Sequence, residues 1–146
     1  MGDVEAIERS MIALRRSQRR RTLARLSGAL PDATVEVIDV IEAAGLAGQP
    51  ATVSTVADAL NTDQPRASKL VAAAVEAGLV ERRADQADGR RSLLARTPAG
   101  VEVTEQVHGF RRRLISSALA SWDKSDVSDF ARLLNRFMTD FASVTR

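Results

Sequence analysis

The sequence contains no cysteine, no tyrosine and only one histidine. Without cysteine, the chain cannot form a disulfide framework, a thiol nucleophile or a cysteine-based zinc site. A single histidine leaves little equipment for acid–base catalysis, and the sequence has no recognisable Ser/His/Asp set or phosphate-binding glycine loop. We therefore expect a protein that is not an enzyme and that carries neither a metal nor a cofactor.

Long apolar runs are also missing. None approaches the roughly 20 residues that a membrane-spanning helix needs. The N-terminus, MGDVEAIERS, starts acidic and lacks the apolar stretch of a secretory signal. Because the absence of cysteine also fits a reducing compartment, we expect a cytoplasmic protein with no membrane partner.

Aromatic residues make up only 3% of the 146 residues, which favours long helices and few strands. The net charge is +2, but it is unevenly distributed. Residues 31–60 contain five acids and no Lys or Arg, whereas residues 61–97 contain seven basic and five acidic side chains. Such an asymmetry is what a phosphate-facing surface requires.

The most informative segment is 55–97. Residues 55–60 predict a short helix, 61–63 a polar break, and 64–77 a second helix that stops at Gly78. Two extended runs, LVERR and SLLART, then surround a charged tip, ADQADGRR. This order predicts a mainly α fold with a small β-wing. It is a winged helix-turn-helix, a module that places one helix in the DNA major groove and a hairpin beside it.

Local signals predict where these elements begin and end. Ser54 is the predicted N-cap of the first helix, and Asp63 is that of the second. Pro65 fits the first turn of the second helix, where a missing N–H costs little. Residues 52–53 predict a short strand that pairs with the wing.

Helices are predicted on both sides of this lobe, at 3–27, at 33–44 and in two C-terminal stretches. The last of them, with Ser125 as predicted N-cap, has a near-coiled-coil seam that calls for a partner surface. We expect residues 1–30 and 101–146 to form a helical dimerisation region and residues 31–100 to form the DNA-binding lobe of one compact chain. The seam consists of Val127, Phe130, Leu134, Phe137, Phe141 and Val144.

The order and spacing of these parts resemble the MarR family of transcription regulators over nearly the whole chain. Residues 68–71 stand where the family usually has Ser-Arg-Leu-Val, and 78–82 match its Gly-Leu-Val-Glu-Arg step almost letter for letter. The wing tip at 88–90 resembles its Asp-x-Arg signature. Departures are Asn-Thr-Asp at 61–63 in place of Gly-Val-Ser, Arg66 in place of a small residue, and Arg96 in place of an apolar one.

The resemblance implies a homodimeric repressor that pairs through its N- and C-terminal helices and binds a pseudo-palindromic operator in double-stranded DNA. It also implies that a small aromatic or phenolic effector lowers the affinity for DNA. The sequence identifies neither the effector nor the target genes, and it leaves activation open beside repression.

Candidate DNA contacts lie in the first turns of the second helix. Arg66 can present two donors to O6 and N7 of guanine, and Gln64 can read adenine. Ser68 and Lys69 suit bases or phosphates. Taken alone, such residues are more often a solvated polar face of a helix, but the helix-turn-helix context favours contact with DNA.

The wing tip supplies further candidates. Arg90 suits a narrow minor groove, and Asp88 is expected to pair with it and aim it. Arg91 is a phosphate contact or plain solvated charge, as are the arginines at 82 and 83. The one histidine, His108, lies on a predicted helix, where a structural role is commoner than metal binding.

A second interpretation stays open, namely a winged-helix protein-interaction module without specific DNA binding. The acidic Asp63 and the modest net charge favour it, whereas the arginines of the wing tip and the second helix argue against it. For the basic run at 15–21, we prefer a solvated surface, or one paired with acids of a dimer mate, over contact with DNA.

Overall fold

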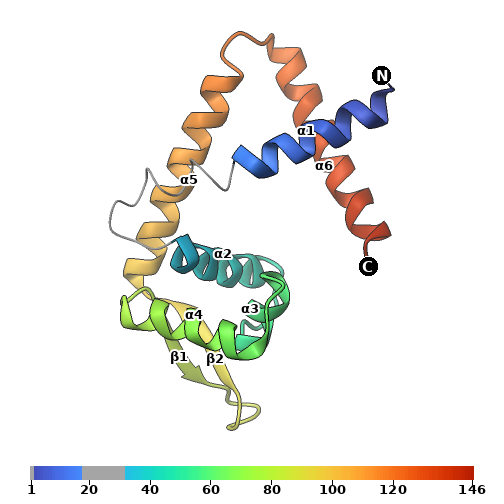
Figure 1. Cartoon of the computed structure of the whole chain (residues 1–146). Helices are drawn as coiled ribbons and strands as arrows, with labels where there is room; N and C mark the ends of the chain where they lie inside the picture. Colours follow the sequence, from blue (N-terminus) through green and yellow to red (C-terminus); the bar gives the residue numbers. More distant parts are fainter. Residues whose placement is uncertain (1, 18–31) are drawn as a thin grey trace. The chain divides into compact units, whose positions relative to one another are not determined.

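A computed structural model describes residues 2–17 and 32–146 of the chain (Figure 1). This part contains six helices and one two-stranded sheet, which confirms the predicted mainly α fold with a small β-wing. The predicted first helix runs to residue 27, and its portion after residue 17 lies outside the described residues. The elements are α1 (Asp3–Ser17), α2 (Asp32–Leu46), α3 (Val53–Ala59), α4 (Gln64–Glu76), β1 (Val80–Ala84), β2 (Ser92–Arg96), α5 (Pro98–Ala118) and α6 (Lys124–Val144).

The chain divides into two compact units, Met1–Gly109 and Phe110–Arg146, with the boundary inside α5. The first unit holds α1, the winged helix-turn-helix lobe and the first half of α5, where Thr104 and Val107 are buried. The second holds the rest of α5 and α6. Among the helices of the described part, none is long and apolar enough to cross a membrane.

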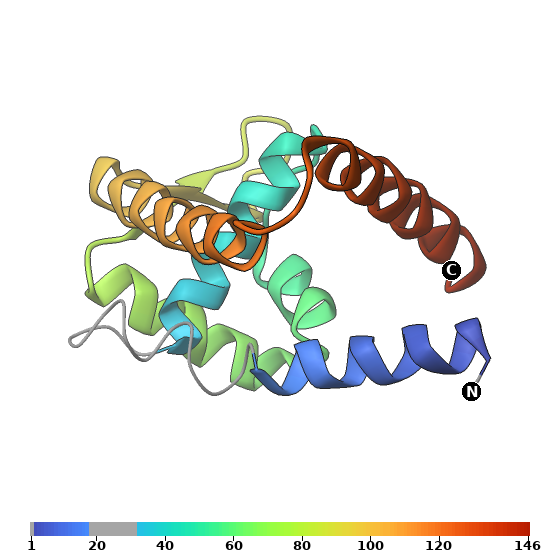
Figure 2. The ribbon, with the colours of Figure 1, turned by 90° about the horizontal axis from the view of Figure 1, so that it is seen from above.

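The core of the lobe lies where α2, α3 and α4 pack against one another, which both views show (Figures 1 and 2). α2 is buried on much of its surface, as its run of β-branched residues predicts. The sheet closes this core from the side, because α2 also contacts β2 and α4 contacts β1. Side chains of the core include Val37, Ile38, Ile41, Val56, Ala67, Val71, Ala74, Leu79, Val80 and Leu94.

α3 begins at Val53, two residues earlier than the sequence predicts. Thr52 has extended backbone angles and is the N-cap, and its hydroxyl accepts from the Thr55 main-chain N–H at 3.2 Å. The Thr55 hydroxyl accepts in turn from the Thr52 N–H at 3.0 Å, which completes a capping box. The prediction of Ser54 as N-cap is therefore wrong, because Ser54 already lies within the first helical turn.

Exchanging Thr52 for alanine should destabilise the lobe, whereas the same change at Ser54 should not remove a cap. Loss of an N-cap hydroxyl costs about 1 kcal/mol, which lowers Tm by roughly 2–4 °C in a chain of this size. Thermal unfolding followed by circular dichroism compares the two variants directly. A larger loss in Ser54→Ala than in Thr52→Ala would contradict the observed cap.

The polar break between α3 and α4 is a left-handed turn. Asn61 has φ 50°, and the N–H groups of Asn61 and Thr62 donate to the carbonyls of Asp58 and Ala57. This is a Schellman ending, in which asparagine takes the left-handed position usually held by glycine. The turn releases the chain into α4, whose predicted N-cap, Asp63, is confirmed: its Oδ1 accepts from the Arg66 main-chain N–H at 2.7 Å.

The wing is an antiparallel hairpin in which Val80 pairs with Arg96 and Ala84 with Ser92. The predicted strand at residues 52–53 is wrong, because these residues form the cap and the first position of α3. The chain just before them does contact the wing, since the Leu94 N–H donates to the Ala51 carbonyl at 2.8 Å. That bond ties the middle of β2 to the start of α3.

In the second unit, α6 begins at Lys124 with Asp123 as its N-cap. The prediction of Ser125 as N-cap is wrong, because Asp123 is the last residue with extended backbone angles and Ser125 lies in the first turn. Trp122 packs edge-on against Phe130 with ring centroids 5.5 Å apart. This contact joins the loop before α6 to the seam of the helix.

Candidate nucleic-acid interface

The first turns of α4 carry the predicted reading side chains at the surface of the lobe. Ala67, Val71 and Ala74 are buried in the core, so the opposite side of α4 faces solvent. A polar helix surface fixed by a packed core is what a reading helix presents to the major groove. All four side chains predicted there are exposed: Gln64, Arg66, Ser68 and Lys69.

Beyond Lys69 the exposed side of α4 is formed by small residues. Ala72 and Ala73 are exposed. Our interpretation of the sequence did not consider these two residues, and so it missed their place on this surface. Small side chains allow a helix to lie deep in a groove, and an alanine methyl group can contact the methyl group of thymine.

Gln64 has a partner within the lobe. Its Nε2 donates to the Ser54 hydroxyl at 3.3 Å, which joins the start of α4 to α3. Ser54, predicted as a cap, thus accepts a hydrogen bond from a side chain at the start of α4 instead. A base-contacting Gln64 must share or give up this bond, so Arg66 and Lys69 are the stronger candidates.

Ion pairing separates the predicted DNA contacts from other basic residues of the lobe. Arg83 pairs with Glu81, and Arg96 pairs with Glu42 at 2.9 Å. Within residues 2–17 and 32–146, by contrast, no acidic side chain pairs with any of the four predicted cationic contacts. Their charges are available to phosphates or bases. These contacts are Arg66, Lys69, Arg90 and Arg91.

A tight turn shapes the wing tip. The Arg91 N–H donates to the Asp88 carbonyl at 3.0 Å, which places Gly89 and Arg90 at the centre of the turn. The Asp88 carboxylate accepts from the Arg90 main-chain N–H at 3.1 Å. Asp88 therefore supports Arg90 through the backbone, and the expected pairing between their side chains is replaced by this contact. The Arg90 guanidinium remains exposed on the tip.

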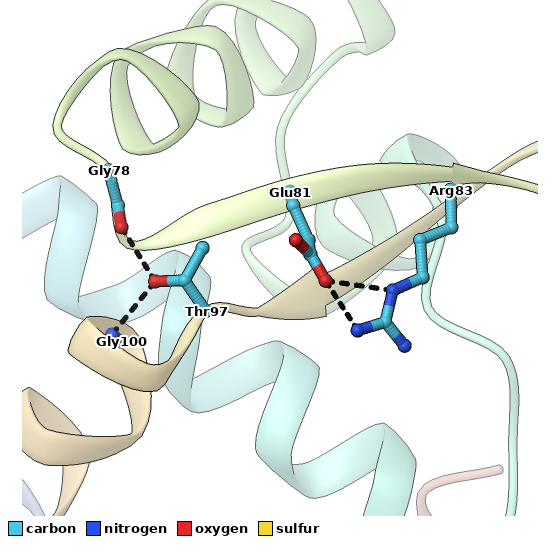
Figure 3. A network of polar contacts seen from close by, with 5 residues as sticks. All are labelled: Gly78, Glu81, Arg83, Thr97 and Gly100. Atoms are coloured by element: carbon cyan, nitrogen blue, oxygen red, sulfur yellow. Dashed lines mark hydrogen bonds and ion pairs between the residues drawn. The ribbon is translucent and has the colours of Figure 1, made fainter.

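The base of the wing is fastened by one hydroxyl group (Figure 3). Thr97 Oγ1 donates to the Gly78 carbonyl at 2.6 Å and accepts from the Gly100 N–H at 3.1 Å. Gly78 ends α4 with φ 77° and Gly100 lies in the first turn of α5. Three elements, namely the reading helix, the wing and α5, therefore meet at a single side chain.

Figure 3 also shows the pair on β1. Arg83 donates through Nε to Glu81 Oε1 at 2.8 Å, and its Nη2 reaches the same oxygen. Both side chains lie on one face of the strand, two residues apart, and both are largely solvated. Such a pair is worth roughly 0–1 kcal/mol. The pairing with Glu81 makes Arg83 less available for a contact with phosphate.

A polar cluster behind the wing escaped our interpretation of the sequence. Glu42 on α2 accepts from Arg96 at the end of β2, and its other oxygen lies 2.6 Å from His108 Nε2 on α5. The lone histidine therefore has a carboxylate partner. Among the described residues, no group of three or more His, Cys, Asp or Glu is arranged to hold a metal ion. The one sign of this cluster in the sequence was Arg96, a charged residue where the MarR pattern has an apolar one.

Comparison with known proteins identifies the lobe. A model of the MarR family matches residues 30–91, which include α2, α3, α4, β1 and most of the wing tip. The winged-helix segment belongs to the MarR family. The resemblance read from the sequence is thereby confirmed. The family that this segment matches consists of transcription regulators and not of enzymes.

Solved structures share the fold beyond the matched segment. A MarR family protein from Bacillus stearothermophilus is 17% identical with a TM-score of 0.82, over 97% of this chain and 99% of that one. RV1404 from Mycobacterium tuberculosis is 20% identical with a TM-score of 0.74, over 95% and 94%. An S. aureus MepR mutant bound to an oligodeoxyribonucleotide is 15% identical with a TM-score of 0.62, over 97% and 99%. No curated protein sequence matches the chain.

Proposed function

We propose that this MarR-family chain is a homodimeric, sequence-specific DNA-binding transcription regulator. The observation that carries the proposal is the set of exposed, unpaired cations at two places on one lobe among the described residues. Arg66 and Lys69 lie at the start of the helix in the reading position, and Arg90 and Arg91 lie on the wing tip. A similar structure, the MepR mutant, is bound to an oligodeoxyribonucleotide, which supports DNA as the partner.

In this proposal the start of α4 enters the major groove and the wing tip reaches the adjacent minor groove. Arg66 reads guanine, while Lys69, Ser68 and Arg91 position the lobe on the bases and the phosphate backbone. Gln64 contributes once it releases or shares Ser54. α2, which packs against α4, carries acidic residues and no Lys or Arg, whereas the start of α4 and the wing tip carry the exposed cations. The positive charge is therefore concentrated on the side proposed to face DNA.

The second copy of the chain is the partner proposed for the terminal helices. α6 has no buried residue, and Phe130, Leu134 and Phe141 remain 45%, 45% and 42% exposed in the single chain. α1 likewise has no buried residue and leaves Val4, Ile7, Met11 and Leu14 exposed. Exposed aromatic seams of this kind mark an association surface. A two-fold dimer built from residues 1–30 and 101–146 would read half-sites about one helical turn apart.

Replacing both Leu134 and Phe141 by glutamate should convert the dimer into monomers at micromolar concentration. An unpaired carboxylate buried in an interface costs several kcal/mol, so we expect a dimer at least roughly 100-fold weaker, and two-fold symmetry doubles the number of buried charges. Sedimentation velocity measures the change. Asn135→Glu, on the opposite side of α6, adds one such charge away from the seam and should leave the dimer intact. A dimeric Leu134→Glu/Phe141→Glu variant would exclude this seam as the interface.

Repression and release by a small effector complete the proposal. A bound effector needs only to prefer a spacing of the two lobes that does not fit successive major grooves. The aromatic or phenolic class of effector rests on the family resemblance. Cytoplasmic location stays a prediction.

Fluorescence anisotropy tests the DNA-binding part. The purified chain is titrated with the DNA upstream of its own gene and with a scrambled duplex, over a series of salt concentrations. A duplex enriched from a random-sequence pool serves as the reference, and we call it the selected duplex. We expect tight, sequence-selective binding whose affinity falls steeply with salt, because several phosphate contacts release counterions.

Equal and weak binding to the upstream and scrambled duplexes would exclude control of its own gene. Failure to enrich any duplex from the random pool would overturn specific DNA binding altogether. The exposed basic face would then support the protein-interaction module instead.

A further inference from the structure

Glu42 is a partly buried carboxylate with a donor at each oxygen. Oε2 accepts from Arg96 Nη1 at 2.9 Å, and Oε1 lies 2.6 Å from His108 Nε2. The three side chains are only 17%, 23% and 27% exposed, in that order. Because the carboxylate accepts, the Nε2 atom of His108 carries the proton in this contact.

The three residues come from three elements that are distant in sequence. Glu42 lies on α2, Arg96 ends β2, and His108 lies in the part of α5 that belongs to the lobe. Other pairs, such as Arg83 with Glu81, join neighbours at the surface. The Glu42 cluster instead links the back of the lobe to the wing and to α5.

Energetics point to a role in geometry. Removing a carboxylate and a guanidinium from water is costly, and well-packed apolar residues in their place are often as stable or more stable. What such a cluster adds is direction, because each charge-assisted hydrogen bond holds its two groups in a narrow range of geometry. The cluster therefore restricts the orientation of β2 and of α5 relative to α2.

A restraint at the end of β2 has a large effect at the wing tip. β2 spans five residues, so it is about 17 Å long, and a tilt of about 10° at its base moves the tip by about 3 Å. A displacement of that size breaks a hydrogen bond to DNA. The other end of β2 leads directly to Arg91 and, one residue earlier, to Arg90.

We propose that Glu42 is a positioning residue for the wing. By holding Arg96 and His108 against α2, it sets the place of Arg90 relative to the reading helix α4. This role rests on the proposed function for its effect on DNA affinity. The restraint itself is a property of the lobe and is measurable without DNA.

Glu42→Gln tests the role with little change in shape. The amide replaces one acceptor oxygen by a donor, so Arg96 or His108 loses its acceptor. We expect affinity for the selected duplex to fall roughly tenfold, within the range that coupled side chains show in double-mutant cycles. The same substitution in an Arg90→Ala background should cost clearly less, because the Arg90 contact is already absent and only Arg91 remains on the wing tip. Glu36→Gln, an exposed carboxylate on the same helix, is the matched control.

Two further variants separate positioning from stability. Arg96→Lys keeps a cation that can donate to Glu42 and should retain most of the affinity, whereas Arg96→Met should lose as much as Glu42→Gln. If Glu42→Gln fails to fold, the double variant Glu42→Gln/Arg96→Met serves in its place. It removes the carboxylate and the guanidinium together, so that no unpaired buried charge remains. It should fold and still bind the selected duplex more weakly.

Amide hydrogen exchange measures, in the absence of DNA, how firmly Glu42 holds β2 and α5. In Glu42→Gln, we expect faster exchange in β2 and at the start of α5, with exchange in α4 unchanged. Equal exchange in the two proteins would overturn the positioning role, as would equal losses of affinity in the native and Arg90→Ala backgrounds. If the native chain selects no DNA, the proposed function fails, but the exchange result still decides whether Glu42 holds the wing.

Discussion

Arg66→Ala is expected to abolish most of the selectivity of this chain for its DNA site. A bidentate contact between arginine and guanine is worth about 1–3 kcal/mol. A two-fold dimer makes the contact twice, so the affinity for the selected duplex should fall by roughly 30-fold or more. Because Arg66 is exposed and has no ion-pair partner among the described residues, its removal leaves no unpaired group behind. Anisotropy on the selected and scrambled duplexes measures the loss.

The way in which affinity is lost across different duplexes distinguishes base recognition from a purely electrostatic contact with phosphate. Arg66→Ala should relax the preference at one base pair in each half-site. Arg91→Ala should instead weaken all duplexes alike and reduce the salt dependence by about one unit for each phosphate that the variant no longer neutralises. Arg132→Ala, at an exposed position on α6, removes the same charge far along the chain and should change neither. Unaltered selectivity in Arg66→Ala would remove this residue from the base contacts.

The ends of α4 were predictable from sequence because single residues impose them. Asp63 has a short carboxylate that reaches the N–H three residues on, which is the geometry of an N-cap. Gly78 takes φ 77°, where other residues are strained. Both positions act through their own backbone, so no tertiary information is needed to place them.

The cap of α3 required tertiary information. Thr52, Ser54 and Thr55 all carry hydroxyls, and sequence alone does not say which residue keeps an extended backbone. The bond from the Leu94 N–H to the Ala51 carbonyl fixes the chain just before Thr52 against the wing. Helix formation therefore starts directly after Thr52, and Ser54 becomes the partner of Gln64 instead.

The Glu42 cluster was beyond sequence reasoning for a related cause. Arg96 stood out as a charged residue in an apolar position, and His108 as the only histidine. Their common partner is 54 and 66 residues away along the chain. No helical or strand period connects positions on three different elements, so only the packed lobe reveals which side chains meet.

Gly100→Ala should have the largest effect on stability. A Cβ at this position would lie 2.1 Å from the Leu79 carbonyl oxygen and 3.3 Å from the Arg96 Cβ. The oxygen has little freedom to move, because it accepts from the Thr97 N–H at 3.1 Å and belongs to the backbone that ends α4. Overpacking against such a site costs about 3 kcal/mol, or roughly 6–12 °C in Tm.

Gly45→Ala provides a control with the opposite sign. Gly45 is also helical, at the end of α2, but nothing lies within 4 Å of the added methyl group. Alanine there should stabilise the chain by up to about 1 kcal/mol, because glycine loses more backbone freedom on folding. If Gly100→Ala were as stable as Gly45→Ala, the result would contradict the close approach of α5 to the Leu79 carbonyl just after α4. The hydroxyl bridge of Thr97, which joins the end of α4 to the start of α5, depends on that approach.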